Sequence, residues 1–383
     1  MELYIHIPFC IRKCEYCSFI SFQADTLQKD IYIDALLEEA RIRKDEFTEP
    51  LKTIYIGGGT PSLLSSSQLR KLVSGLCEYV SADNCFEFTI EANPGTLTEE
   101  FVKTSAELGI NRFSLGMQAY QKVLLKRLGR IHTYTDVMKS VELLKKNHIE
   151  NYNLDLIFGC PGQSYEDWIE TLRAAISLQP SHISTYGLIP EEGTPLFSRL
   201  EKKEYALPEQ ETERDMYDYC IRILSASGYH QYEISNFALT GFECCHNIGY
   251  WTQIPYIGLG VSAASMIVSE PAGNAFSCIR KKNPDSLADY YRMVYRKDKS
   301  VVESEIVGPE ESRFETMMLS LRMNRGINEQ HFFEMHGVSI AECYGPQLSE
   351  MEKKGLMKHV NGAWSLTRKG MDIQNAVLLE FMN

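Results

Sequence analysis

The sequence predicts an α/β fold: an open barrel of six βα units, about three-quarters of a closed cylinder, followed by a small α+β domain. Apolar runs of strand length alternate with amphipathic helical segments over residues 3–189, which indicates parallel strands joined by helices. Six units are fewer than the eight of a closed barrel. The chain from residue 284 onward instead combines short helical segments with the turn signal Asn361-Gly362.

The expected strands are short runs rich in Ile, Leu and Phe, which suits strands buried on both faces of a parallel sheet. They cover residues 3–8, 51–56, 86–92, 111–117, 151–158 and 182–189. Between them, apolar residues recur at helical spacing with charged residues in the intervals. These helices are expected over residues 25–47, 66–80, 98–108, 123–128, 134–147 and 165–178.

The rest of the chain divides into two further parts. Residues 191–228 are charged and helical. We therefore expect a barrel domain over 1–230, a connecting segment over 231–283 and a C-terminal domain over 284–383. In the last part, helices precede a hairpin over 355–367, which suggests a winged-helix-like domain.

From residue 309 onward there are eight Lys or Arg against ten Asp or Glu, which argues against DNA binding.

Composition excludes several classes of protein. With 383 residues, 44% of them hydrophobic, the chain is long enough for two to three domains with a sizeable core. The formal net charge of -12 argues against a general nucleic-acid binder. No apolar run is long enough to span a membrane, and no signal peptide precedes the first strand. We expect a cytoplasmic protein, with peripheral membrane association left open, whose 11 cysteines are thiols and metal ligands.

Three cysteines stand directly after the first strand. Cys10, Cys14 and Cys17 have the spacing C-x3-C-x2-C, and thiolates grouped so closely suit a thiophilic metal. A structural zinc site and an ordinary iron-sulfur cluster both use four protein ligands. Three thiolates on a four-iron cluster would leave one iron open to a cofactor or substrate. Zinc and three unligated thiols are the alternatives.

Glycines and polar residues stand at the ends of the later strands. The carboxyl ends of parallel strands form the working face of such a barrel, and glycines there let a ligand approach the backbone. Acids, an amide and an arginine on one rim can bind hydroxyl groups and a carboxylate. Taken singly, each is equally explained as a capping or loop-closing residue. The candidates are Gly58, Gly59, Thr60, Glu91, Gln118, Arg130 and Asp155.

The cysteine spacing resembles that of the radical S-adenosylmethionine (SAM) superfamily. The stretches YIHIPFC, GGGTPS, EANPG, LGRIH, NLDLI and EEGTPL occur in this order and resemble the oxygen-independent coproporphyrinogen III oxidase family over essentially the whole chain. The resemblance implies an open radical-SAM barrel and a [4Fe-4S] cluster on the three cysteines. It implies that SAM is held by the rim residues above together with Tyr4 and Tyr16.

Two details favour the haem-chaperone branch of that family. The oxidases carry a fourth cysteine two residues after the third, where this chain has Phe19. His246, Asn247, Tyr250 and Trp251 match an HNxxYW haem motif, and imidazole is a good axial ligand beside stacking aromatic rings. The alternative is a Tyr/Trp pair packed in the core beside a surface histidine. Relatives also carry a histidine where this chain has Ala264, which would weaken any role of that histidine here.

The resemblance therefore implies a haem chaperone with a [4Fe-4S] cluster and SAM, whose partners are haem, a haem-acceptor protein and an electron donor. The alternative is a radical SAM enzyme that acts on a tetrapyrrole, as the coproporphyrinogen III oxidases do. Phe19 argues against that oxidase activity, whereas the complete set of SAM-type residues favours some enzyme of this kind. A plain electron-transfer protein would leave the glycine loop and the polar rim without a role.

Overall fold

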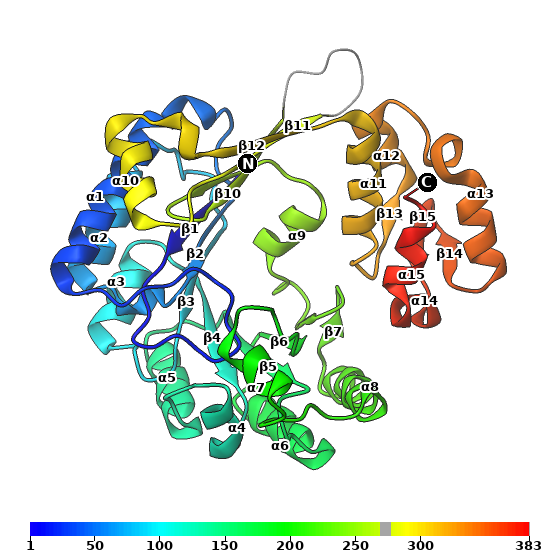
Figure 1. Cartoon of the computed structure of the whole chain (residues 1–383), viewed down its shortest axis with the longest axis horizontal. Helices are drawn as coiled ribbons and strands as arrows, with labels where there is room; N and C mark the ends of the chain where they lie inside the picture. Colours follow the sequence, from blue (N-terminus) through cyan, green and yellow to red (C-terminus); the bar gives the residue numbers. More distant parts are fainter. Residues whose placement is uncertain (269–276, 383) are drawn as a thin grey trace.

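The computed structural model describes residues 1–268 and 277–382 and contains one sheet of 12 strands. At its centre, six parallel strands follow one another in chain order, each paired with the next. The sheet does not close on itself, so the predicted open (β/α)6 barrel is confirmed (Figure 1). The six strands are β1 (Glu2–Ile7), β2 (Thr53–Gly58), β3 (Glu87–Ala92), β4 (Arg112–Gln118), β5 (Tyr152–Phe158) and β6 (His182–Gly187).

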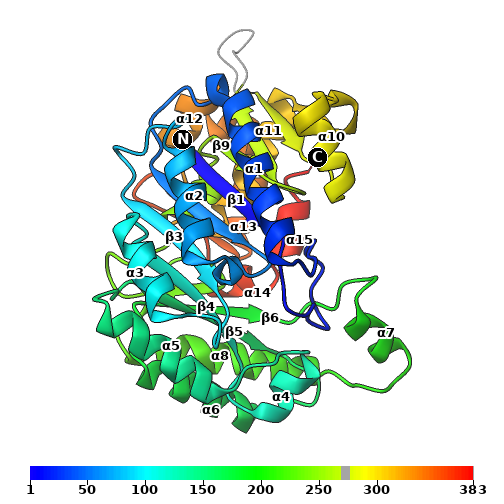
Figure 2. The ribbon, with the colours of Figure 1, turned by 90° about the vertical axis from the view of Figure 1, so that its left-hand side faces the viewer.

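Helices cover the outer face of these strands (Figure 2). Several begin at a capping box, in which the N-cap side chain accepts the backbone N–H of the residue three positions on, whose side chain accepts the N-cap N–H. Asp25, Ser65 and Ser164 are the N-cap residues of such boxes. The helices of this layer are α1 (Thr26–Ile42), α2 (Ser66–Leu76), α3 (Glu99–Glu107), α4 (Lys122–Arg127), α5 (Tyr134–Lys146), α6 (Tyr165–Ser177) and α8 (Gln210–Ala226); short 3-10 turns are η1 (Lys44–Glu46) and η2 (Pro61–Leu63). α7 (Pro195–Glu201) lies apart from this layer, and the Leu196 N–H donates to the carbonyl of Glu15 in the cysteine loop (Figure 2).

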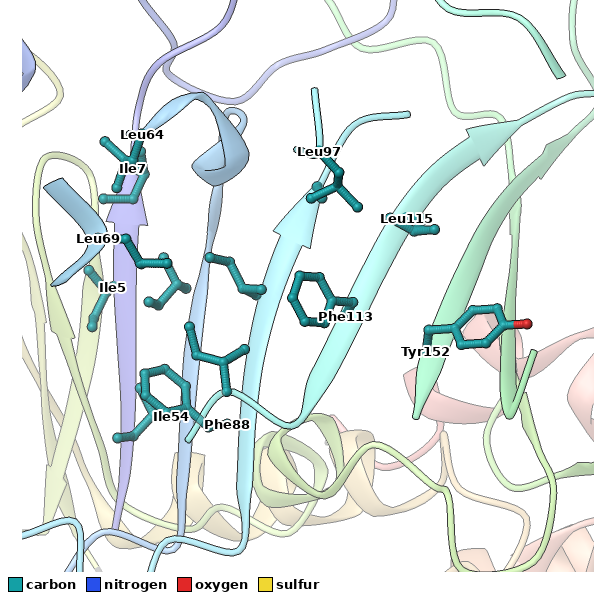
Figure 3. Packing of buried hydrophobic residues seen from close by; sticks show 14 of the residues in the cluster. Ile5, Ile7, Ile54, Leu64, Leu69, Phe88, Leu97, Phe113, Leu115 and Tyr152 are labelled. Atoms are coloured by element: carbon teal, nitrogen blue, oxygen red, sulfur yellow. The ribbon is translucent and has the colours of Figure 1, made fainter. Parts of the chain in front are cut away.

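The main core lies between the strands and this helical layer. Ile5, Ile54 and Phe113 are among its buried side chains (Figure 3), and burying a side chain of that size stabilises a fold by about 1.5–3 kcal/mol. The other face of the strands is also buried, but it is polar. Alternate residues there, such as Glu87 and Glu91 of β3, face the inside of the barrel.

Both edges of the sheet are extended by strands that the sequence did not predict. β9 (Tyr256–Leu259) pairs in parallel with β1. Beyond it, β10 (Ala264–Val268), β11 (Cys278–Lys282) and β12 (Glu303–Val307) are antiparallel, as are β8 (Asn236–Ala238) and β7 (His230–Gln231) at the other edge. Between the two edge groups the chain forms α9 (Cys245–Trp251), whereas α10 (Leu287–Arg296), followed by the 3-10 turn η3 (Lys299–Val301), packs against α1.

The C-terminal region has a second core around Phe332 and Leu348. Its hairpin turns at Asn361 and Gly362, both with positive φ, as a two-residue hairpin loop requires. The predicted winged-helix-like α+β fold is confirmed, and the exact domain boundaries stay a prediction. The elements are α11 (Pro309–Ser320), β13 (Ile327–Asn328), α12 (Glu329–His336), α13 (Ile340–Lys353), β14 (Met357–Val360), β15 (Ala363–Leu366), α14 (Arg368–Asp372) and α15 (Gln374–Leu379).

The C-terminal region contacts the rest of the chain at several places, among them backbone hydrogen bonds that join residues 232–234 to residues 322–324. Gly308 alone separates β12 from α11, and a Cβ at that position would contact nothing within 4 Å. On the other side, Arg214 and Arg368 form ion pairs with Asp218 and Asp372, which link α8 to α14. Within the described residues, no helix has the length and apolar character needed to cross a membrane.

Candidate functional site

A cavity of about 530 Å³ opens at the carboxyl ends of the parallel strands. Its wall combines the three motif cysteines with most of the polar residues that the sequence singled out. The sequence-predicted residues that line it are Cys10, Cys14, Cys17, Tyr16, Gly58, Gly59, Glu91, Gln118, Arg130 and Asp155. The strand ends therefore bring together residues that are far apart in the sequence, as a parallel barrel should.

The cysteine loop is closed at its base by the backbone. The N–H of Cys10 donates to the carbonyl of Phe22 at 2.9 Å, and the N–H of Phe22 donates to Pro8. Gly59 allows this close packing, because a Cβ there would lie 2.8 Å from the carbonyl oxygen of Phe9. Gly58 has φ +110°, and its added Cβ would lie 2.5 Å from the His6 ring. Packing against the cysteine loop therefore explains these glycines as directly as ligand binding does.

The three cysteine side chains are partly exposed and share one wall of the cavity. Among the described residues they do not converge as the ligands of a single metal ion would; a four-iron cluster holds each thiolate on a different iron and needs them further apart. Arg130 donates from Nη1 to the Cys14 Sγ at 3.5 Å, and Cys10 Sγ lies 3.6 Å from the Thr60 hydroxyl. Burial raises the pKa of Cys10 and of Cys17.

Two partly buried carboxyl groups, those of Glu91 and Asp155, lie near enough in the cavity for their charges to interact. Glu91 accepts hydrogen bonds from the Tyr55 hydroxyl at 2.8 Å and from the Gly58 N–H at 3.0 Å. Burial, and after it the charge of Asp155, raises the pKa of Glu91 to about 7. Asp155 accepts from Ser114 at 2.9 Å and from Asn153 at 2.8 Å, and burial raises its pKa too. Both groups are fixed acceptors for the hydroxyl groups of a ligand.

An amide and a guanidinium complete the wall. Arg130 donates from Nη2 to the Gly116 carbonyl at 2.9 Å and to the Asn93 side chain. Gln118 is held at φ 65°, a conformation that a residue with a side chain rarely adopts. Its Oε1 is buried and has no hydrogen-bond partner among the described residues. Buried polar atoms are normally paired, so this oxygen is an acceptor that a ligand could satisfy.

Two of the predicted SAM residues lie outside this cavity, and several of its residues were not predicted. Tyr4 sits beneath it, where its hydroxyl contacts His6 Nδ1 at 2.9 Å. Thr60 lines a smaller adjoining cavity of about 220 Å³ and accepts from Asn93 at 2.7 Å. The unpredicted lining residues include Tyr55, Asn93, Ser114 and Tyr186. The signal for Asn93 was its place directly after a strand, but nothing local distinguishes Tyr55.

The HNxxYW sequence lies on α9, which docks at the opposite end of the same strands, between the barrel and α11 (Figure 1). The carboxylate of Glu87, the first residue of β3, accepts the backbone N–H groups of Cys245 at 2.8 Å and His246 at 3.0 Å. Glu2, the first residue of β1, approaches Gly249 so closely that no Cβ would fit there. Acidic residues at the strand starts therefore fix α9 inside the barrel.

His246 is fully buried. Its Nδ1 lies 2.7 Å from the Thr53 hydroxyl and its Nε2 lies 2.9 Å from the Tyr250 hydroxyl. Burial, and after it the charge of Arg112, lowers the pKa of His246 to about 3, so the ring is neutral. The alternative of a surface histidine beside a packed Tyr/Trp pair is wrong, since the histidine is the fully buried member of the motif.

The other motif residues lie nearer the surface of α9. Asn247, Tyr250 and Trp251 are each partly exposed, and the Trp251 ring receives the Arg322 guanidinium of the C-terminal region at 4.6 Å. The motif thus connects the barrel to that region. Ala264, where relatives carry histidine, is exposed at the start of β10.

Comparison with known proteins gives two family models and a set of full-length relatives. The Radical SAM superfamily matches residues 4–175, and the HemN C-terminal domain matches residues 307–373. Heme chaperone HemW of Bacillus subtilis is 36% identical over 381 residues, which cover 99% of this chain and 98% of that protein. Heme chaperone HemW of Escherichia coli is 32% identical over 385 residues, which cover 100% and 98%. The chain belongs to the HemW family.

HemW family membership confirms the resemblance that the motifs predicted. A solved structure of coproporphyrinogen III oxidase (HemN) from Escherichia coli, a radical SAM enzyme, has a TM-score of 0.83 and 22% identity, covering 99% of this chain and 89% of that chain. At that identity the likeness shows the fold, an open barrel with a C-terminal domain. Membership of the radical SAM family implies a [4Fe-4S] cluster and SAM.

The thiols and polar side chains that line the cavity suit a [4Fe-4S] cluster and SAM. Three thiols on one wall can ligate three irons. The unpartnered Gln118 Oε1 and the carboxyl groups of Glu91 and Asp155 are acceptors suited to the amino and hydroxyl groups of SAM. Gly116 keeps the wall open, because a Cβ there would lie 2.9 Å from both Arg130 Nη2 and Gln118 Nε2. The cavity therefore combines a polar wall with a set of three thiols.

Proposed function

We propose that this protein is a haem chaperone that binds haem, passes it to an acceptor protein, and carries a [4Fe-4S] cluster with SAM at the barrel mouth. The observation that carries the proposal is similarity to HemW proteins over the full length of the chain. Phe19 supports it further, because the position of the oxidases' fourth cysteine holds a ring that is 66% exposed at the cavity mouth.

At the mouth, Cys10, Cys14 and Cys17 are the proposed cluster ligands. Such a cluster, when bound, supplies a single electron and an open iron for SAM. The guanidinium of Arg130, beside Cys14, offsets the negative charge of the thiolates. Tyr4, Tyr16, Gly58, Gly59, Thr60, Glu91, Gln118 and Asp155 are the proposed SAM-binding residues, with Arg130.

On α9, His246, Asn247, Tyr250 and Trp251 are the proposed haem residues. A neutral imidazole is the form that ligates iron, and the lowered pKa keeps His246 in that form. In this structure Thr53 and Tyr250 contact the two ring nitrogens of His246. Ligation of haem iron by His246 therefore requires one of these contacts to be exchanged. The remaining proposed partners are a haem-acceptor protein and an electron donor, and the proposed location is the cytoplasm.

Haem titration of the full chain after anaerobic reconstitution tests the proposal. We expect the wild type to bind about one haem per chain through a histidine ligand, seen in the Soret absorbance. His246→Phe keeps an aromatic ring in the buried site but removes the ligand, and should weaken haem binding at least about tenfold. His148→Asn, a change at an exposed histidine away from α9, is the matched control. Equal haem affinity in His246→Phe and wild type would contradict the assignment of the ligand.

Radical SAM chemistry on a tetrapyrrole is the second candidate, favoured by the polar cavity beside the thiols. It predicts that coproporphyrinogen III is consumed in step with the release of methionine and 5′-deoxyadenosine. The haem-chaperone proposal predicts no such coupling. Incubating the reduced, reconstituted protein with SAM, with and without coproporphyrinogen III, and quantifying all products by chromatography therefore separates the two functions.

A further inference from the structure

A series of side-chain contacts connects α9, at the base of the barrel, to the cavity at its mouth. The His246 ring stacks on Tyr55, with centroids 5.2 Å apart and planes inclined by 29°. The Tyr55 hydroxyl donates to Glu91 in the cavity, and Glu91 accepts the N–H of Gly58 in the glycine loop. The partly buried ring of Tyr55 thus connects His246 to Glu91, which in turn holds the backbone of Gly58.

A second branch leads from Tyr55 to the cysteine loop. The Tyr4 ring lies beside Tyr55, with centroids 6.3 Å apart and planes inclined by 29°. The Tyr4 hydroxyl contacts His6 Nδ1 at 2.9 Å, and His6 Nε2 contacts the carbonyl of Ile20 at 3.2 Å, just after the three cysteines. Tyr55 is therefore linked to Glu91 directly and to the cysteine loop through Tyr4 and His6, and the His246 ring stacks on Tyr55 from the side of the barrel base.

His246 is well fixed in that position. Thr53 and Tyr250 hold its ring nitrogens, and Glu87 holds its backbone N–H. Because a packed interior is not continuously deformable, removing this ring would leave a void that Tyr55 could fill only by moving. Such a movement would lengthen the Tyr55–Glu91 hydrogen bond.

We propose that His246 is a positioning residue for the SAM cavity, so that ligation of haem by His246 and binding of SAM at the barrel mouth weaken each other. The haem half of this statement rests on the proposed function; the positioning half rests on the contacts alone. When His246 gives up Thr53 or Tyr250 to reach an iron, its ring also leaves Tyr55. A SAM molecule that binds through Glu91 then favours the position in which His246 stacks on Tyr55 and does not ligate haem. Bound haem in turn lowers the affinity for SAM by the same factor.

SAM affinity of the anaerobically reconstituted full chain tests the positioning half. Calorimetric titration is done with the cluster oxidised, so that SAM is not consumed, and the electron paramagnetic resonance spectrum of the reduced cluster is recorded with and without SAM. We expect His246→Ala to bind SAM about tenfold more weakly, the effect of losing one hydrogen bond to a charged group. His246→Phe, which keeps the stacked ring, should stay within about twofold of the wild type.

Arg322→Met is the matched control, because it loosens α9 at its other end without touching Tyr55. We expect its SAM affinity to equal that of the wild type. Wild-type affinity in His246→Ala would overturn the proposal. An equal loss in Arg322→Met would also overturn it, since the loss would then reflect general loosening of α9 and not support of Tyr55.

Haem titration of the wild type with and without saturating SAM tests the haem half. We expect SAM to weaken haem binding about as much as haem weakens SAM binding, as reciprocity demands. Haem affinity that is unchanged or raised by SAM would overturn the coupling. Absence of any haem binding would contradict the proposed function instead, and the SAM affinities of the variants would still decide the positioning role.

Discussion

The two ends of the barrel are built from the same strands but in opposite ways. At the carboxyl ends, the cysteines are partly exposed, Gln118 Oε1 lacks a partner among the described residues, and a cavity of about 530 Å³ is open. At the amino ends, His246 is fully buried with both ring nitrogens engaged. A ligand can therefore enter the cavity at the carboxyl ends without rearrangement, whereas a ligand of His246 at the amino ends would first have to displace Thr53 or Tyr250.

Loss of a cluster ligand should have the largest effect on function, and this effect should be confined to the carboxyl ends of the strands. We expect Cys14→Ala to abolish assembly of the four-iron cluster, because only three thiolates are available as ligands. The thermal midpoint of the apo protein should hardly change, since this side chain is partly exposed. Iron and sulfide content after reconstitution, with Cys77→Ala at an exposed cysteine as control, measures the effect. An unaltered four-iron centre in Cys14→Ala would contradict the ligand assignment.

Gly58→Ala should damage the mouth through packing. The added Cβ would lie 2.5 Å from the His6 ring, at a backbone φ of +110°. We expect a loss of about 3 kcal/mol in the free energy of unfolding, from overpacking together with backbone strain. Gly109→Ala also has positive φ but meets nothing within 4 Å, so it should lose only about 1 kcal/mol. Urea denaturation compares them, and equal losses would show that the contact with His6 does not matter.

The buried histidine at the base should make the fold sensitive to acid. The pKa of His246 is lowered to about 3 in the folded chain, whereas an unfolded histidine titrates near 6.5. As pH falls, the unfolded chain takes up this proton first, so stability present above pH 6.5 is lost progressively down to pH 3. Between pH 7 and pH 5 this group should remove about 2 kcal/mol from the free energy of unfolding.

Urea denaturation at the two pH values measures this loss. In His246→Phe the same change of pH should cost correspondingly less stability, whereas His148→Asn, at an exposed position, should lose as much as the wild type. An identical pH dependence in wild type and His246→Phe would mean that the base is more open to water than its burial indicates.

Thr53→Val should have the smallest effect and should be confined to the base. The substitution keeps the shape of the side chain but removes the hydroxyl that contacts His246 Nδ1 at 2.7 Å. We expect a loss of about 1 kcal/mol in the free energy of unfolding, the usual value for one hydrogen bond. Cluster content should be that of the wild type, which distinguishes this variant from Cys14→Ala. A variant that fails to assemble the cluster would show that the two ends are not separable in this way.

The sequence predicted the mouth far better than the base. Cys10, Cys14 and Cys17 lie close together in the sequence, and Gly58, Glu91 and Gln118 stand at or next to strand ends, so the rule for parallel barrels was enough to gather them. Asp155, in the middle of β5, lines the same cavity. The Asn361-Gly362 turn was also a local signal, and both residues have the positive φ that it implies.

The base depends on long-range contacts that no local pattern encodes. β9 is four residues long and joins the sheet only because β1 offers a free edge. α9 enters the barrel because Glu87 caps its backbone and Glu2 packs against Gly249. We predicted the strands as apolar runs buried on both faces. Thr53 and Tyr55 alternate with apolar residues, and this period-two pattern, which our prediction did not use, corresponds to a polar barrel interior.

Gly308 limits how the molecule can expose α9. This residue alone separates β12 from α11, and backbone hydrogen bonds between residues 232–234 and 322–324 hold the start of the C-terminal region against the barrel. Its far side is fastened by the ion pairs of Arg214 and Arg368 with Asp218 and Asp372, all of them partly or fully exposed to solvent. Screening by salt weakens such pairs, so raising the ionic strength should loosen the contact between α8 and α14 before the backbone hydrogen bonds between residues 232–234 and 322–324.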